Sequence, residues 1–149
     1  MLTASDEIRN LLGRYCEAID RGDWVAVGDL FAHGCLATDD GAELARGRDA
    51  VAAFYRDGTR LHDGVPRTKH LVTNTVLRFD SPSDAVATSS YVVLQAVDGA
   101  VALQPIIAGR YTDTFADRAE VGGWHFLERR FAVDLVGDLS HHLTWPLDD

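Results

Sequence analysis

The chain has 149 residues, a size that buries a substantial core without disulfides or metals. Hydrophobic residues make up 46% of it and charged residues 25%, as in an ordinary globular protein. The formal net charge of −9 argues against a nucleic-acid or anionic-membrane surface, because both require clustered Lys and Arg. We therefore expect no nucleic-acid partner and no membrane partner.

The first part of the chain shows helical patterns. Ser5 precedes two acids, and a short polar side chain followed by acids favours a helix start at Ser5. Apolar residues then recur at helical spacing as far as Gly22, and Tyr15 lies on this apolar stripe. A second short helix is expected over 24–32 and a third over 47–58. Their apolar anchors are Val25, Leu30 and Phe31 in the second, and Val51, Phe54 and Tyr55 in the third.

After Pro66 the pattern changes to that of long strands. The expected strands, rich in Val, Thr and aromatic residues, are 68–79, 84–97, 100–115 and 123–136. The turns between them are short, which predicts an antiparallel meander. A short hairpin is expected over 35–47 and an irregular tail over about 137–149. Helices followed by a run of strands indicate an α+β fold, here as one domain over 1–149.

Four segments carry a resemblance to a known family. They are "IRNLLGRYCEAIDRGDWVAVGDLF", "KHLVTN", "GRYTDTF" and "GWHFLERR", and together they extend over nearly the whole chain. On these segments the sequence resembles the SnoaL-like group of the NTF2-like superfamily. The resemblance implies a cone, in which N-terminal helices pack on a curved, mainly antiparallel sheet. It fixes no single activity, because this fold hosts many chemistries and some domains with none.

His70 and Asp20 are the first candidate catalytic pair. Strict alternation places His70, Val72, Asn74 and Val76 on one strand face, which Asn74 would make polar. Taken alone, His70 is more simply a surface or core histidine, and Asp20 a solvated acid at a helix end. The helix dipole disfavours an acid there, so a compensating partner is expected. The resemblance to dehydratases and dehydrohalogenases implies that Asp20 pairs with His70 and leaves one ring nitrogen free as a base.

Tyr15 and Arg129 complete the set of candidate catalytic residues. The bile-acid dehydratases of the family carry the same tyrosine-then-aspartate spacing as Tyr15 and Asp20. Alternation puts Arg129 on the face of Leu127, Phe131 and Val133, which we expect to be inward, and the family carries an arginine at this place. The neighbouring Arg130 fits an exposed, ion-paired residue instead. Arg110 stands near the place of a second histidine in scytalone-type dehydratases, and the absence of that histidine puts their exact mechanism in doubt for this chain.

The other polar residues gave no catalytic pattern. His141 and His142 read as a polar tail, His33 and His62 as loop residues, and His125 as a strand residue facing solvent. Cys16 and Cys35 are too few for a disulfide scaffold and lack the spacing of metal ligands. No motif for a cofactor, phosphate or metal occurs, so we expect no cofactor and no metal. No apolar run reaches the ~18 residues of a membrane span and no signal-peptide pattern occurs, which predicts a cytoplasmic protein.

The expected function is that of a cofactor-independent lyase, a dehydratase acting on a small, largely apolar or polycyclic substrate in the cone cavity. His70 would be the base, oriented by Asp20, with Tyr15 donating to an oxygen and Arg129 stabilising negative charge. The candidate substrate-binding residues are Asn74, Phe54 and Tyr55. A ketosteroid isomerase-like or polyketide cyclase-like enzyme remains an alternative, as does a non-catalytic ligand-binding domain or oxygenase small subunit. A homo-oligomer, dimer or trimer, is also expected.

Overall fold

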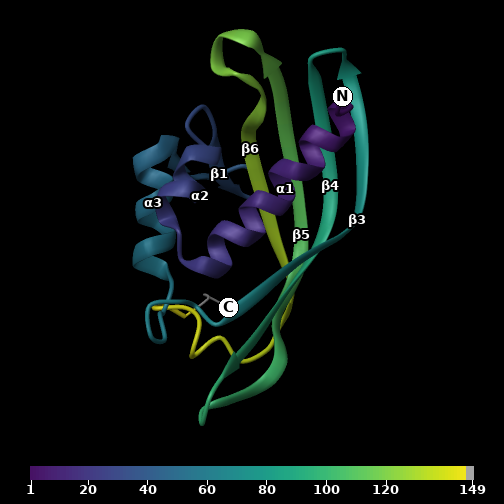
Figure 1. Cartoon of the computed structure of the whole chain (residues 1–149). Coiled ribbons are helices and arrows are strands. Elements are labelled where there is room, and N and C mark those ends of the chain that lie inside the picture. The colour runs from purple at the N-terminus through teal and green to yellow at the C-terminus, as the bar shows by residue number, and fades with distance from the viewer. Residues whose placement is uncertain (147–149) are drawn as a thin grey trace.

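The computed structural model describes residues 1–146, and its elements follow the expected order (Figure 1). The helices are α1 (Ala4–Arg21), α2 (Trp24–Leu30) and α3 (Gly47–Gly58), with a short 3₁₀ turn at Ala119–Val121. The strands are β1 (Cys35–Thr38), β2 (Glu43–Arg46), β3 (Thr68–Ser81), β4 (Asp84–Val97), β5 (Val101–Arg118) and β6 (Gly123–Val136). The expected bounds of α3, β4 and β6 are thus confirmed to the residue. Within residues 1–146, none of the helices has the length and apolar character needed to cross a membrane.

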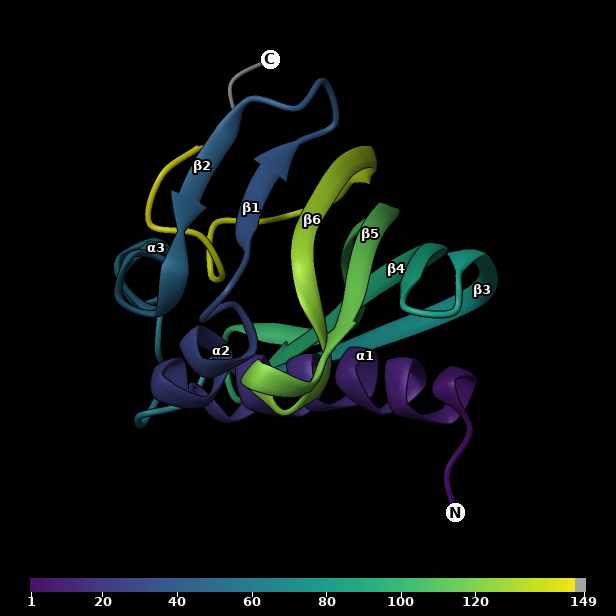
Figure 2. The ribbon, with the colours of Figure 1, turned by 90° about the horizontal axis from the view of Figure 1, so that it is seen from above.

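All six strands belong to one sheet, in the order β2-β1-β6-β5-β4-β3. Strands β3 to β6 form the expected antiparallel meander, and β1 adds to β6 in parallel, a pairing that the sequence did not predict. Figure 2 shows the sheet as a curved layer with α1 lying across it, while α2 and α3 lie near β1 and β2. The α+β architecture, helices packed on a curved and mainly antiparallel sheet, is confirmed.

The ends of α1 fix where its polar residues lie. The N-cap is Thr3 rather than Ser5: the Thr3 hydroxyl accepts from the Asp6 amide, and the Asp6 carboxylate accepts from the Thr3 amide at 2.9 Å. At the other end Gly22 adopts φ +67°, the left-handed conformation that glycine enters without steric cost. The helix therefore ends right after Asp20, which leaves this acid in the last turn.

The core lies between the helices and the facing side of the sheet. Ile8 and Ile19 of α1 are almost completely buried, and Phe31 stacks on Phe126 of β6 with ring centroids 4.7 Å apart. The expectation for the short second helix was partly wrong. Val25 is 69% exposed, and Val27 is the buried anchor instead, because two residues along a helix rotate the side chain by about 200° to the opposite face.

A β-bulge changes the alternation of β3. Asn74 adopts φ +54° and the register of β3 against β4 shifts between Thr73 and Val76. Beyond this point Thr75 becomes half-buried and Val76 is 65% exposed. The prediction that Asn74 and Val76 share the face of His70 is therefore wrong, because one extra residue moves the following side chains to the opposite face.

A second bulge acts on β6. The register against β5 shifts between Thr114 and Phe115, which leaves Leu127 outside the ladder. Phe126 and Arg129 are both fully buried, whereas Leu127 and Val133 are each 39% exposed. Arg129 therefore points inward as expected, and Phe131 lines the inner side too, but Leu127 and Val133 do not share this face. Its inward neighbour along the strand is Phe126, not Leu127.

Candidate active site

The last turn of α1 brings Asp20 against the start of β3. Oδ1 of Asp20 accepts a hydrogen bond from Nδ1 of His70 at 2.7 Å and another from the hydroxyl of Thr68 at 2.9 Å. The backbone N–H of His70 donates to Oδ2 at 2.9 Å. Both side chains are largely buried, with 8% of His70 and 13% of Asp20 exposed. The contact expected between these two residues is present, and Thr68 is an additional member that the sequence did not indicate.

The charge of Asp20 fixes the tautomer of His70. Burial raises the pKa of Asp20, but the hydrogen bonds and charge of His70 together with the Thr68 hydroxyl outweigh it and lower that pKa. Asp20 is then an ionised carboxylate at neutral pH and can only accept hydrogen bonds. Nδ1 of a neutral His70 must therefore carry the proton, which leaves the lone pair on Nε2. A histidine held in this way has the arrangement of a general base.

Tyr15 presents its hydroxyl beside this pair. It is 3% exposed, its ring lies edge-on to that of His70 with centroids 6.5 Å apart, and its hydroxyl is 2.5 Å from the hydroxyl of Tyr55 on α3. Burial raises the pKa of Tyr15, although the charge of Arg129 opposes the rise. Both phenols are therefore protonated at neutral pH. One of the two hydroxyl protons forms the hydrogen bond between the two oxygens, so the other can be donated to a third group.

Arg129 lies behind the tyrosines rather than beside open space. It is fully buried, and its Nε and Nη2 donate to the two carboxylate oxygens of Asp113 at 2.7 and 2.8 Å. The guanidinium lies over the rings of Tyr15 and Tyr111, 4.2 and 3.6 Å from their centroids. Burial raises the pKa of Asp113, and the charge of Arg129 opposes this rise. The pair is ionised, because a guanidinium keeps its proton and here faces both carboxylate oxygens.

A small cavity lies in front of these groups. Its volume is about 110 Å³, and His70 forms part of its wall together with apolar residues such as Val93 and Phe131. The remaining polar lining comes from Tyr15, Tyr55, Tyr91, Tyr111 and His142. The hydroxyl of Tyr91 donates to the carbonyl of Ala132 at 3.2 Å and is thereby occupied. His70, the Tyr15–Tyr55 pair and His142 are therefore polar groups that this cavity still has available.

The chain after β6 forms part of the wall of this cavity. Residues 139–145, which we call the C-terminal strap, contain no regular helix or strand, in keeping with the expected irregular tail. The interpretation of His141 and His142 as a polar tail was nevertheless wrong for His142. That residue is 8% exposed and lines the cavity, with its ring centroid 6.3 Å from that of His70.

Backbone contacts hold the strap against the end of α3. The amide of Arg60 donates to the carbonyl of His142 at 2.8 Å, and its Nε donates to the carbonyl of Leu143 at 2.8 Å. The amide of Thr144 donates to the carbonyl of Gly58 at 3.0 Å. These bonds place the strap without relying on a packed helix, which is why hydrophobic periodicity gave no sign of it.

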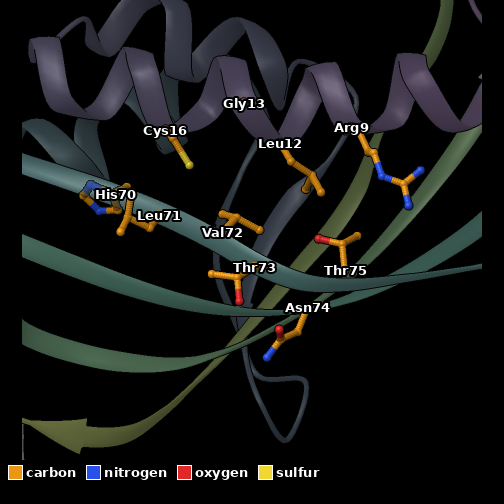
Figure 3. Close-up of a pocket in the computed structure, with 10 residues that line it drawn as sticks. All are labelled: Arg9, Leu12, Gly13, Cys16, His70, Leu71, Val72, Thr73, Asn74 and Thr75. Carbon is orange, nitrogen blue, oxygen red and sulfur yellow. The ribbon is translucent and has the colours of Figure 1, made fainter.

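A larger and open cleft of about 630 Å³ runs between α1 and β3 on the other side of His70 (Figure 3). Arg9, Leu12 and Cys16 of α1 line it opposite β3. Asn74 is exposed and points away from α1 in Figure 3, so it does not meet the groups around Asp20. Burial raises the pKa of Cys16 to about 11, which leaves a protonated thiol rather than a nucleophile.

The other residues singled out in the sequence lie outside the cavity. Phe54 packs edge-on between Tyr55 and Trp145, with ring centroids 5.3 and 6.0 Å away, and so supports Tyr55. Arg110 pairs with Asp134 at 2.9 Å on the exposed surface. The neighbour Arg130 pairs with Glu128 at 2.5 Å, as expected for a surface arginine. Among residues 1–146, no three His, Cys, Asp or Glu side chains gather as a metal site would require.

The comparison with protein families decides the relationship. The family model of the SnoaL-like domain matches residues 1–130. The chain belongs to the SnoaL-like family. Among solved structures, this SnoaL-like protein is similar to a single-residue variant of Rv3472, a protein of unknown function from Mycobacterium tuberculosis. The two are 28% identical with a TM-score of 0.70, over 87% of this chain and 75% of that one.

Two further structures share the fold at lower identity. A protein provisionally named scytalone dehydratase from Novosphingobium aromaticivorans is 21% identical, with a TM-score of 0.68 over 88% of this SnoaL-like chain and 84% of its own. ActVI-ORFA from Streptomyces coelicolor is 19% identical, with a TM-score of 0.72 over 89% and 98% of the two chains. Other neighbours carry the NTF2-like and cystatin-like names in their descriptions. The NTF2-like fold expected from the sequence is thereby confirmed.

Proposed function

We propose that this SnoaL-like protein is a cofactor-independent dehydratase that eliminates water from a small, uncharged β-hydroxy carbonyl compound. The observation that carries the proposal is the 2.7 Å contact between Nδ1 of His70 and Asp20, with the Tyr15–Tyr55 hydroxyl pair on the same cavity. The fold likeness to a protein named for scytalone dehydration suggests the reaction class to test first.

His70 takes the proton in the first step. Nε2 removes a hydrogen from the carbon next to the substrate carbonyl, and the electrons of the C–H bond move to the carbonyl oxygen as an enolate. The imidazolium that forms is stabilised by Asp20, whose carboxylate already lies 2.7 Å from Nδ1. Proton transfer of this kind contributes about 10²–10⁴-fold to rate.

The Tyr15–Tyr55 pair acts on oxygen. The hydroxyl proton that the pair does not use internally donates to the enolate oxygen or to the departing hydroxyl. The enolate then expels the β-hydroxyl, which takes up the proton gained by His70 and leaves as water, so the products are an unsaturated carbonyl compound and water. Arg129 lies 4.2 Å from the Tyr15 ring centroid, and its positive charge opposes the rise in the pKa of this phenol. Its proposed role is thus positioning and electrostatic support through Tyr15, in place of the stabilisation of developing negative charge that was expected from the sequence.

A second candidate function is isomerisation. The same base and the same hydroxyl pair would form an enolate in a ketone with a distant double bond, and return the proton to another carbon. The His70 base favours this alternative over a silent binding domain, because a binder needs no base oriented by a carboxylate. The predicted homo-oligomer stays a prediction.

The test is the dehydration of 3-hydroxycyclohexanone to cyclohexenone, followed by the ultraviolet absorbance of the product. Wild-type protein should accelerate the reaction, and His70→Gln should lower the rate by about 10²–10⁴-fold while the protein stays folded. Proton exchange of cyclohexanone in D₂O, followed by NMR, measures the first step alone and covers the isomerase alternative.

His125→Gln is the matched control. Nδ1–H of this histidine donates to the Gly123 carbonyl at 2.9 Å, and the side chain lies outside the cavity lining. Its variant should behave as wild type in both assays. A His70→Gln protein that retains the wild-type rate of both reactions would remove the proposed base.

A further inference from the structure

His142 is a buried polar residue with an unused hydrogen-bonding atom. Among the atoms of residues 1–146, its Nδ1 is buried and has no hydrogen-bond partner. A buried polar atom without a partner destabilises a fold, so such atoms are rare and call for an explanation. The strap holds this ring in place through its backbone: the His142 carbonyl accepts from Arg60 at 2.8 Å. The side chain itself is committed to no protein group.

The ring belongs to the same cavity as the proposed base. His142 and His70 both line it, with ring centroids 6.3 Å apart, and Tyr15 and Tyr55 complete this side of the wall. Burial lowers the pKa of His142 to about 4, with the charge of His70 acting in the same direction and Asp20 opposing it. At neutral pH His142 is an uncharged imidazole with one N–H donor and one acceptor nitrogen.

The cavity offers no unbalanced positive charge. The phenols are protonated, and the buried guanidinium of Arg129 is matched by Asp113 at 2.7 Å. Asp20 adds a negative charge beside His70. An anionic ligand would lose its hydration here without gaining a cation, whereas a hydroxyl or carbonyl group would find donors and acceptors.

We propose that His142 is a substrate-binding residue, which hydrogen-bonds an oxygen of an uncharged substrate and so makes the C-terminal strap a working part of the site. The proposal deepens and rests on the proposed function, because the same cavity must hold the substrate. It assigns the substrate class as neutral hydroxyl or carbonyl compounds and excludes carboxylates. At about 110 Å³ the cavity is smaller than the ~300–1,000 Å³ typical of ligand pockets, so it fits small substrates.

The test separates binding from turnover. Protein labelled with ¹⁵N-histidine is titrated with cyclohexanone as a neutral probe and with cyclohexanecarboxylate as its anionic counterpart. The expected result is a shift of the His142 ring nitrogens on addition of cyclohexanone, and a much weaker response to the carboxylate. His142→Phe fills the same space without a hydrogen bond and should weaken cyclohexanone binding by about 3–10-fold.

Two further variants control for a purely structural role. His142→Asn retains a polar atom near the place of Nδ1 and should keep the affinity of wild type within about 3-fold. The neighbouring His141→Phe, which leaves the cavity lining unchanged, should have no effect on binding. If His142→Phe does not fold, the nitrogen shifts of the wild type and the affinity of His142→Asn still decide the question.

Three results of the binding experiments would overturn the inference. They are cyclohexanone binding without a shift at His142, equal affinity in wild type and a folded His142→Phe, and no binding of cyclohexanone to wild type. Failure of the proposed function looks different. In that case cyclohexanone binds and shifts His142, but neither dehydration nor proton exchange depends on His70. The reverse outcome, with catalysis dependent on His70 and unaffected by His142→Phe, leaves the function standing and removes His142 from the site.

Discussion

Two pairs, each of a carboxylate and a basic side chain, lie on the inner side of the same sheet and differ in how completely they are buried. Arg129 and Asp113 are both fully buried, and two hydrogen bonds join the guanidinium to the carboxylate. Asp20 and His70 retain 13% and 8% exposure, and His70 borders both the small cavity and the open cleft. One pair is enclosed by protein, and the other reaches space that a substrate can enter.

Under the proposed function, the difference separates a structural pair from a chemical one. The carboxylate of Asp113 binds two nitrogens of the Arg129 guanidinium. The aromatic rings of Tyr15 and Tyr111 lie against that guanidinium. In the Asp20–His70 pair the carboxylate uses Nδ1 only, so the second ring nitrogen remains for a substrate. Burial by itself is therefore a poor guide to catalytic residues, and the decisive feature is an atom left available beside a cavity.

The largest expected effect comes from Asp20→Asn, which tests the Asp20–His70 pair. Oδ1 accepts from the His70 ring and from Thr68, and Oδ2 accepts from the His70 backbone amide, so either amide orientation places an NH₂ against a donor. The variant therefore favours the wrong His70 tautomer. Turnover of 3-hydroxycyclohexanone should fall by about 10²–10⁴-fold. An Asp20→Asn protein with wild-type turnover would show that the Asp20–His70 pair is structural, like the Arg129–Asp113 pair.

The next effect is on stability and tests the Arg129–Asp113 pair. Arg129→Met leaves the Asp113 carboxylate buried without its partner, and the free energy of unfolding should fall by about 3–5 kcal/mol. Denaturant unfolding measures this loss. Adding Asp113→Leu to Arg129→Met should recover most of it, because the unpaired charge is then gone. If the double variant is as unstable as the single one, the ion pair is not the cause.

Arg130→Met is the matched control for that measurement. Its side chain is 41% exposed and paired with Glu128 at the surface, so the loss should stay within about 1 kcal/mol. The folded double variant then allows a fair test of catalysis. A turnover near that of wild type would show that Arg129 contributes to folding stability alone and gives Tyr15 no electrostatic support.

A smaller effect should appear in the pH dependence of stability, and it comes from His142, whose ring lies near that of His70. The pKa of buried His142 is about 4, below its ordinary value of 6.5, so between these values the unfolded chain binds a proton that the folded chain does not. Stability should therefore be constant above about pH 6.5 and fall by roughly 2–4 kcal/mol as the pH drops to about 4. The lowered pKa of Asp20 adds a further loss only below about 3.8. Unfolding curves of wild type and His142→Phe check this, and equal slopes in the two would contradict it.

Much of the fold follows from local sequence patterns. The bounds of α3, β4 and β6 could be read from apolar spacing and turn residues, because these are properties of neighbouring residues. The bulges at Asn74 and Leu127 could not, since each depends on how one strand meets the next. For this reason the sequence pattern predicted the wrong face for Asn74 and Val76.

The candidate site divides in the same way. The Asp20–His70 contact was expected from the family resemblance, and the structure contains it. Asp113 was missed because its partner is set by strand register, which places it directly across from Arg129. His142 was missed because the strap has no periodic pattern and is placed by backbone hydrogen bonds to Arg60. An acid within the apolar strand β5 was the only local sign of a buried charge pair.

The strap also carries an aromatic residue at its far end. Trp145 is 41% exposed, lies against Gly58 where any added side chain would meet its ring, and packs edge-on to Phe54 at 6.0 Å. The other two tryptophans, Trp24 and Trp124, lie in α2 and β6. With those two replaced by phenylalanine, the fluorescence of the protein would come from Trp145 alone. Any release of the strap would carry this indole further into water and shift its emission to longer wavelength, so Trp145 would report such a motion optically.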